Sequence, residues 1–333
     1  MCYNTYITKK IGVINMDYKK IVIAGGGILG SQIAFQSAYC GYDVTILVRK
    51  EDAKRSVRAK LDKLRDTYIE TIELMKKGNE WARGIANTDK FDAKKCIESA
   101  NKAYESIKLE HDQKSALADA DLVIESITEN LDAKIALYEQ IAPILPEKTV
   151  LVTNSSTLLP SKLAYHTGRP EKYLALHFAN SIWKNNTAEV MGHQNTDKKY
   201  FDEIMAFAES INMIALPVKE EKAGYLLNSM LVPFLLSAMD LLANGISDPE
   251  SIDKAWTLGT GAPKGPFQII DTVGLMTAKN IVEQYQKVPG LISPLLKKMM
   301  LPYNYKKMLE LLNKYIAEGK LGKSTGEGFY KYK

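Results

Sequence analysis

A chain of 333 residues, 46% of them hydrophobic and 25% charged, has the composition of a globular protein long enough for two domains. No apolar run of about 18 residues occurs, so we expect no membrane partner, and the first residues lack the apolar stretch of a signal peptide. The net charge of +5 is modest and lysines alternate with acidic residues, so a nucleic-acid partner is not implied. Three scattered cysteines argue against a disulfide framework, and we expect a cytoplasmic protein.

A glycine pattern follows the first strand-like segment. Residues 21–24 are β-branched or small, and Gly25-x-Gly27-x-x-Gly30 leads directly into a helix-like run. The first glycine allows a tight turn, the second lets the backbone approach phosphate, and the third lets helix pack on strand, while the helix N-terminus favours a pyrophosphate. The alternative is a turn that packs and binds nothing. We expect dinucleotide contacts from Gly25, Gly27, Ile28, Leu29 and Gly30.

The next segments predict a doubly wound sheet with an insertion. Residues 44–48 are typical of a second parallel strand, and the lysine- and glutamate-rich residues 50–105 predict an inserted helical hairpin. Strands and helices then alternate, which predicts an α/β fold of the Rossmann type over residues 17–218. The expected strands are 106–109, 122–126, 149–153, 173–177, 188–191 and 213–216, and the expected helices between them include 131–145 and 198–211.

The pattern changes near residues 217–222, where long helical runs replace the strands. Pro233 lies inside the first of these runs and predicts a kink. We therefore expect an all-α C-terminal domain at residues 219–333. Residues 1–16 are expected to be a loose N-terminal extension, with Met16 as an alternative start.

Candidate catalytic side chains follow the ends of predicted strands. His177 ends an apolar strand, where a doubly wound sheet presents ligand sites. Glu189 on the next strand could fix the tautomer of the imidazole and stabilise its protonated form. Asn154 and Ser156 follow another strand and could bond a ligand, although such residues are also common in turns. Hydride transfer to nicotinamide needs one general base and neutral donors, which His177 and Ser156 would supply.

Other interpretations of these residues stay open. His177 could be a hydrogen-bonded core residue and Glu189 a surface carboxylate. Ser156, His177 and Glu189 could form a hydrolase triad, but Ser156 lacks the G-x-S-x-G turn that exposes a nucleophile. No H-x-x-x-H or C-x-x-C spacing occurs, so we expect no metal site.

Besides the glycine pattern, the sequence contains an ordered set of motifs: Glu125-Ser-Ile-Thr-Glu-Asn130, Asn154-Ser-Ser156, His177-Phe-x-Asn180, Glu189, Asn228 after Gly224, Gly265-Pro-Phe267 and Gly326-Glu-Gly-Phe-Tyr330. With this set, the sequence from Tyr18 to Lys333 resembles the L-3-hydroxyacyl-CoA dehydrogenase family. The segments Asn154-Ser-Ser-Thr-Leu-Leu-Pro and Asn185-Asn-Thr-Ala-Glu-Val-Met-Gly are most similar to the branch with diketoreductase and 3-hydroxybutyryl-CoA dehydrogenase-like proteins.

The resemblance implies roles for individual residues. His177 would be the general acid/base and Glu189 its orienting partner, with hydride passing between NAD(P) and C3 of a 3-hydroxy/3-oxoacyl substrate. The helical domain would form a homodimer. Substrate and nicotinamide would be bonded by Ser156 and Asn228, and the cofactor would be contacted by Asn154, Glu129, Lys134 and Asn180.

The sequence departs from the family in three respects. Val48 replaces the acidic residue that holds the adenosine ribose of NAD, and Arg49 beside it could pair with the 2′-phosphate of NADP, so NAD and NADP both stay open. Leu64 and Thr71 replace a serine and a lysine that would contact CoA, and Ser324 replaces a cofactor-side lysine. A CoA thioester, a free diketo or 3-oxo acid or ester, and a sugar acid oxidised at C3 remain alternatives, as does a crystallin-like dinucleotide-binding structural protein.

Overall fold

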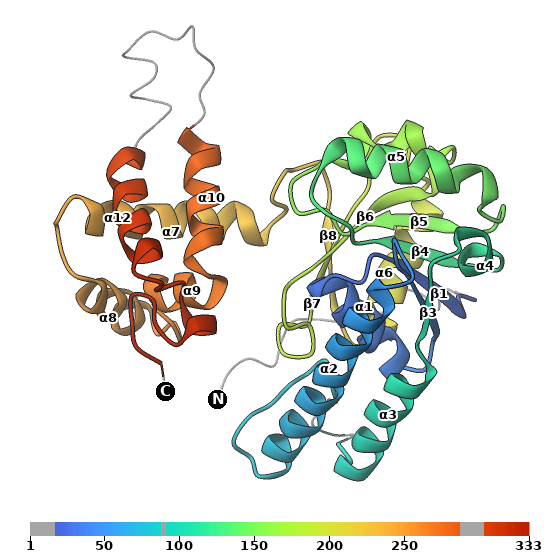
Figure 1. Cartoon of the computed structure of the whole chain (residues 1–333), viewed down its shortest axis with the longest axis horizontal. Helices are drawn as coiled ribbons and strands as arrows, with labels where there is room; N and C mark the ends of the chain where they lie inside the picture. Colours follow the sequence, from blue (N-terminus) through green and yellow to red (C-terminus); the bar gives the residue numbers. More distant parts are fainter. Residues whose placement is uncertain (1–16, 88, 90, 287–302, 333) are drawn as a thin grey trace, which may run out of the picture. The chain divides into compact units, whose positions relative to one another are not determined.

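The computed structural model describes residues 17–87, 89, 91–286 and 303–332, so the predicted extension 1–16 lies outside the described residues. The chain divides into a sheet unit, Met1–Leu226, and a helical unit, Leu227–Lys333 (Figure 1). The division falls after the predicted boundary at residue 218 because the connecting residues bond to the sheet unit. The N–H of Ser161, for example, donates to Glu221 Oε1 at 2.7 Å, and the N–H of Lys222 to Met191 Sδ at 3.2 Å.

The described part of the sheet unit contains one eight-stranded sheet with the order β3-β2-β1-β4-β5-β6-β7-β8. All neighbouring strands are parallel except β6 and β7, which are antiparallel. This arrangement confirms the predicted doubly wound fold. The strands are β1 Lys20–Ala24, β2 Asp43–Leu47, β3 Lys108–Glu110, β4 Leu122–Glu125, β5 Val150–Thr153, β6 Tyr173–Phe178, β7 Thr187–Met191 and β8 Ile214–Val218.

Helices cover both faces of the sheet (Figure 1). Because side chains alternate along a strand, β1 sends Ile21 and Ile23 into one core, and Val22 and Ala24 into the other. Helices α1, α2, α3 and α6 contribute to the first core, and α4 and α5 to the second. The helices are α1 Ile28–Tyr39, α2 Ala53–Lys76, α3 Ala93–Ser106, α4 Gln113–Leu117, α5 Leu131–Ile141 and α6 Lys198–Ser210.

Most expected elements are found within two residues of their predicted bounds, and two of the shifts have a local reason. The strand expected at 106–109 begins only at Lys108, because α3 runs to Ser106. The helix expected at 131–145 ends at Ile141 and continues as a 3₁₀ turn, because Pro143 has no N–H for an α-helical bond. The predicted hairpin is present as α2 and α3, and Leu64 and Thr71 lie on the buried side of α2.

The helical unit packs five described helices around Leu236, Phe267 and Met308. Pro233 lies within α7, as expected. Within the described residues, no helix is both long and apolar enough to span a membrane. The helices are α7 Leu227–Ala243, α8 Pro249–Thr260, α9 Pro266–Val273, α10 Leu275–Gln286 and α12 Tyr305–Ala317.

Two buried carboxylates organise the loops of the helical unit. Asp253 accepts the N–H of Phe267 at 2.8 Å, and Asp271 accepts the N–H groups of Phe329 and Tyr330 at 2.8 and 2.9 Å. A Cβ at Gly328 would lie 2.1 Å from Asp271 Oδ1. The Gly265-Pro-Phe267 and Gly326–Tyr330 motifs therefore close around these carboxylates.

Candidate active site

The glycine turn between β1 and α1 contains two kinds of glycine. Gly25 has φ +119°, and a Cβ there would lie 2.5 Å from Ser126 O. A Cβ at Gly30 would lie 2.1 Å from Gly25 O. Both glycines are therefore required by the packing of the turn itself. Around Gly27, in contrast, no heavy atom lies within 4 Å of the Cβ position, so its backbone is open to a ligand.

A pocket joins this turn to the ends of β4 and β5. Its empty volume is about 800 Å³. Ile28, at the N-terminus of α1, is 72% exposed and offers the pocket an uncovered apolar side chain. The open backbone and the helix N-terminus fit a dinucleotide pyrophosphate. The lining residues are Gly25, Gly27, Ile28, Leu29, Gly30, Ser126, Ile127, Thr128, Glu129, Asn154 and Ser156.

The predicted general base lies in a hydrogen-bonded row of three side chains. His177 and Glu189 are directly opposite each other on β6 and β7, and His177 Nδ1 is 3.0 Å from Glu189 Oε2. His177 Nε2 is 3.2 Å from Ser156 Oγ. Because a carboxylate only accepts hydrogen bonds, the proton of the neutral imidazole is on Nδ1, and Nε2 presents a lone pair toward Ser156. The sheet thus brings Ser156, His177 and Glu189 together.

Tyr225 packs against this row, and its contact was not predicted from the sequence. Its ring is stacked on the imidazole of His177, with 4.5 Å between centroids and 11° between planes. Its hydroxyl donates to Ser155 O at 2.7 Å, and the next N–H, of Leu226, donates to Glu189 Oε1 at 2.8 Å. Burial raises the pKa of Tyr225 well above its usual value, so the hydroxyl remains a donor. The φ of +51° at Tyr225, directly after Gly224, has no sequence signal.

The predicted cofactor residue Lys134 is buried between two carboxylates. Its Nζ lies 2.6 Å from Glu125 Oε1 and 3.6 Å from Glu129 Oε2. Glu125 Oε2 also accepts the hydroxyls of Tyr138 and Thr153, both at 2.8 Å. Lys134 is only 1% exposed, so its ammonium holds the carboxylates in place beneath the pocket. Glu129, in contrast, lines the pocket itself.

Glu129 is ionised by its surroundings. Burial alone would raise its pKa, but hydrogen bonds from Ser155 Oγ and from the N–H and hydroxyl of Thr157 outweigh burial and keep the pKa below its usual value. Lys134 adds to this effect. The pocket therefore carries a negative charge next to the end of β5.

The remaining predicted residues lie in different places. Asn154 lines the pocket and accepts the N–H of Phe178 at 3.0 Å, which ties β5 to β6. Asn180 is exposed just after β6, and Asn228 belongs to α7 of the helical unit. Val48 is buried directly after β2, and Arg49 is exposed.

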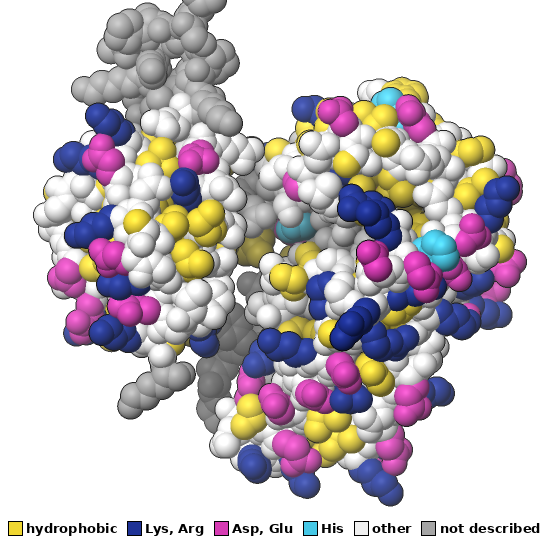
Figure 2. All heavy atoms as spheres, in the orientation of Figure 1, with side chains coloured by type: hydrophobic (Ala, Val, Ile, Leu, Met, Phe, Trp, Pro, Cys, Tyr) yellow, Lys and Arg dark blue, Asp and Glu magenta, His cyan; other side chains and the backbone are white. Residues whose placement is uncertain are grey.

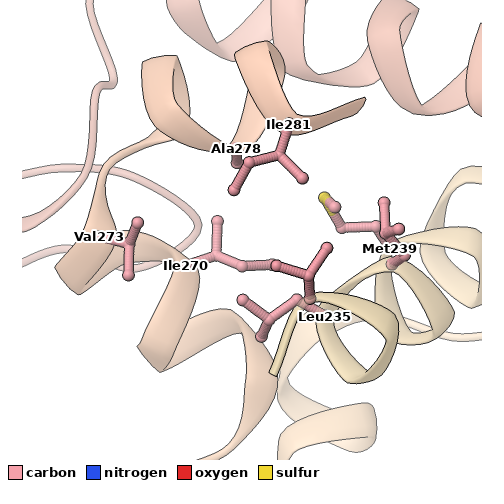
Figure 3. A pocket seen from close by; sticks show the side chains of 8 residues that line it. Leu235, Met239, Ile270, Val273, Ala278 and Ile281 are labelled. Atoms are coloured by element: carbon pink, nitrogen blue, oxygen red, sulfur yellow. The ribbon is translucent and has the colours of Figure 1, made fainter. Parts of the chain in front are cut away.

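The helical unit has a pocket of a different character, with an empty volume of about 300 Å³ (Figure 3). Only apolar side chains from α7, α9 and α10 line it, so it offers neither an acid nor a base. Across the described residues, no three His, Cys, Asp or Glu side chains are grouped to hold a metal ion. The lining residues are Val232, Leu235, Leu236, Met239, Ile270, Val273, Ala278 and Ile281.

A sheet with an open glycine turn and a nearby histidine–carboxylate pair defines a dinucleotide-binding oxidoreductase. Family models agree. The NAD-binding domain of 3-hydroxyacyl-CoA dehydrogenase matches residues 20–221, and the C-terminal domain of the same enzyme matches residues 224–332.

Individual relatives cover nearly the whole chain. The solved structure of a diketoreductase, described in work on dual catalysis of dicarbonyl compounds, is 43% identical over 95% of this chain and 99% of its own, with a TM-score of 0.79. The human mitochondrial hydroxyacyl-coenzyme A dehydrogenase is 31% identical over 95% of this chain and 91% of its own length. A probable 3-hydroxybutyryl-CoA dehydrogenase of Bacillus subtilis is 29% identical over 95% and 98%. The chain therefore belongs to the 3-hydroxyacyl-CoA dehydrogenase family, which confirms the resemblance.

Proposed function

We propose that this oxidoreductase moves a hydride between C3 of a 3-hydroxy/3-oxoacyl compound and NAD(P), with His177 as general acid/base. The observation that carries the proposal is the row Ser156–His177–Glu189 beside a pocket that includes the glycine turn. The nicotinamide, when bound, supplies or accepts the hydride. In oxidation, Nε2 of His177 takes the proton of the C3 hydroxyl, and in reduction it returns that proton.

The neighbouring residues support this proton transfer. Glu189 holds the proton of Nδ1 and offsets the positive charge that forms on the imidazole. When the substrate hydroxyl takes the place of Ser156 as donor to Nε2, the single hydroxyl proton of Ser156 is free to donate to the substrate oxygen as charge develops on it. The same row has the spacing of a hydrolase triad, but a hydrolase has no use for the glycine turn. We also propose cofactor contacts by Asn180 and a substrate contact by Asn228.

The substrate is a 3-oxo or 3-hydroxy compound in either of two forms. The human and bacterial relatives favour a CoA thioester, as their names state. The diketoreductase favours a free dicarbonyl compound. Leu64 and Thr71 support this second form, because they replace the expected CoA contacts and are only 9% and 3% exposed. A sugar acid oxidised at C3 is the further alternative. We propose a cytoplasmic homodimer, which would cover exposed apolar residues of the helical unit such as Met230 and Leu258.

A matrix of reactions tests this function. NADH and NADPH are each combined with acetoacetyl-CoA, a free 3-oxo acid and a diketo ester, and the loss of reduced-cofactor absorbance is measured. We expect at least one combination to turn over. No oxidation of either cofactor with any 3-oxo substrate, at concentrations that saturate cofactor binding, would refute the proposal. Turnover of the free compounds without the thioester would assign the second substrate form.

A further inference from the structure

Three elements converge where the adenosine end of a dinucleotide leaves the glycine turn. Strands β1 and β2 are parallel neighbours with Ala24 opposite Leu47, so the glycine turn and residues 48–49 emerge at the same sheet edge. Helix α2 packs onto the turn, because a Cβ at Gly26 would lie 2.4 Å from Val57 Cγ2. One turn further along α2, Lys60 Nζ donates to Gly26 O at 3.2 Å.

This hydrogen bond fixes a cation beside the turn. An ammonium has three N–H donors, and the carbonyl of Gly26 uses one of them, so two remain for a ligand. Lys60 is half-buried, which limits screening by water. Arg49 adds an exposed guanidinium at the end of β2, where an acidic residue would bind the hydroxyls of an NAD ribose.

The nearby carboxylates are already paired with other side chains. Glu51 lies 2.8 Å from Lys54 Nζ and 2.7 Å from His111 Nδ1, and Glu110 lies 3.9 and 3.4 Å from the same two atoms. Within the described part of the chain, neither Lys60 nor Arg49 has a carboxylate partner within 4.0 Å. Figure 2 shows lysine and arginine side chains gathered on the face of the sheet unit above the hairpin.

We propose that Lys60 and Arg49 bind the 2′-phosphate of NADP and make the enzyme prefer NADP to NAD. This inference rests on the proposed function and decides between its two cofactors. A phosphate monoester is close to doubly charged at neutral pH and accepts several hydrogen bonds, which a guanidinium and an ammonium satisfy. Val48 neither repels that charge nor offers an acceptor to an unphosphorylated ribose.

The test compares two lysines of one helix. Lys63 lies three residues after Lys60 on α2, and its side chain is exposed. Dissociation constants for NADPH, NADH and the fragment 2′,5′-ADP are measured on wild type, Lys60→Met and the control Lys63→Met. We expect Lys60→Met to raise the dissociation constants of NADPH and 2′,5′-ADP about tenfold or more, because a charge-assisted bond is lost. The dissociation constant of NADH should change less than about twofold. Arg49→Met should also weaken NADPH binding selectively. Lys63→Met should change the dissociation constant of neither cofactor.

Some outcomes overturn the proposal. Wild type that binds NADH more tightly than NADPH would do so, as would Lys60→Met that weakens both cofactors equally or neither. Because these are binding measurements, they separate this inference from the proposed function. A selective loss of NADPH binding supports the phosphate site even if no 3-oxo substrate turns over. Turnover with NADH alone would support the function and reject the site.

Discussion

The buried carboxylates of the sheet unit and those of the helical unit have different kinds of partner. In the sheet unit, Glu125 is paired with Lys134 at 2.6 Å, and Glu189 with His177 at 3.0 Å. In the helical unit, the partners of Asp271 are backbone N–H groups and a tyrosine hydroxyl. The first arrangement places ionisable groups beside a pocket, whereas the second holds loops on helices.

This difference separates two uses of an acidic side chain. Glu125 and Lys134 form a buried ion pair at 2.6 Å, so this pair is a fixed support. In the proposed reaction His177 takes up and returns a proton, so Glu189 supports a group that changes charge. Asp253 and Asp271 have no such partner among the bonds described for them and serve the fold. The motifs that carry the family resemblance include Glu125 and the His177–Glu189 pair, whereas Asp253 and Asp271 lie outside those motifs.

Replacement of His177 tests the pair that takes part in proton transfer, and we expect it to have the largest effect of the variants considered. His177→Ala removes the general acid/base, so we expect kcat to fall about 10²–10⁴-fold. Binding of NAD(P)H should be retained, because the glycine turn is unchanged. Stopped-flow turnover and cofactor titration measure the two quantities. Wild-type kcat in this variant would place the proton transfer on another residue.

Replacement of Lys134 probes the fixed support. Lys134→Met leaves Glu125 buried without its cation, and we expect the free energy of unfolding to fall by about 3–5 kcal/mol. The double variant Glu125→Gln/Lys134→Met removes both charges and should recover most of that loss. Urea titration followed by circular dichroism gives the comparison. Equal destabilisation in the single and double variants would show that the charge of Glu125 is not the cause.

Replacement of Asp271 tests the buried carboxylates that stabilise the loops of the helical unit. Asp271→Asn places an amide nitrogen toward N–H and hydroxyl donors, so we expect a loss of about 2–3 kcal/mol in the free energy of unfolding. Glu310→Gln, an exposed residue of α12, removes the same charge and should cost less than about 0.5 kcal/mol. Thermal melts of the two variants provide the measurement. Similar melting temperatures would contradict the role given to Asp271.

The sequence predicted those parts of the site that depend on local pattern. The glycine turn is one, because Gly25 and Gly30 are required by its packing and Gly27 leaves its backbone open, all within six residues. The His177–Glu189 pair is another, since a residue at a strand end and one on the next strand can meet only if the strands pair. The two residues are only twelve positions apart, which favours the pairing of the two consecutive strands that carry them.

Contacts made across the fold could not be predicted in this way. Lys60 meets Gly26 only because the inserted hairpin folds back on the turn, and residues 50–105 showed only helical periodicity. Tyr225 reaches His177 through a positive φ that sequence does not reveal. The role of Asp271 was also missed, because the tail that covers it is far away in the chain.

Tyr225 supports His177 through ring stacking and not through a charge, so we expect its replacement to have the smallest effect of the variants considered. Tyr225→Phe keeps the stacked ring and loses the bond to Ser155 O, so we expect a loss of about 1 kcal/mol in stability and nearly wild-type kcat. Tyr225→Leu also removes the ring and should lower kcat about tenfold, because the imidazole loses a contact that orients it. Steady-state kinetics at saturating cofactor separates the two variants. If both keep wild-type kcat, strand pairing with Glu189 alone positions His177, and the stacked ring contributes only to packing.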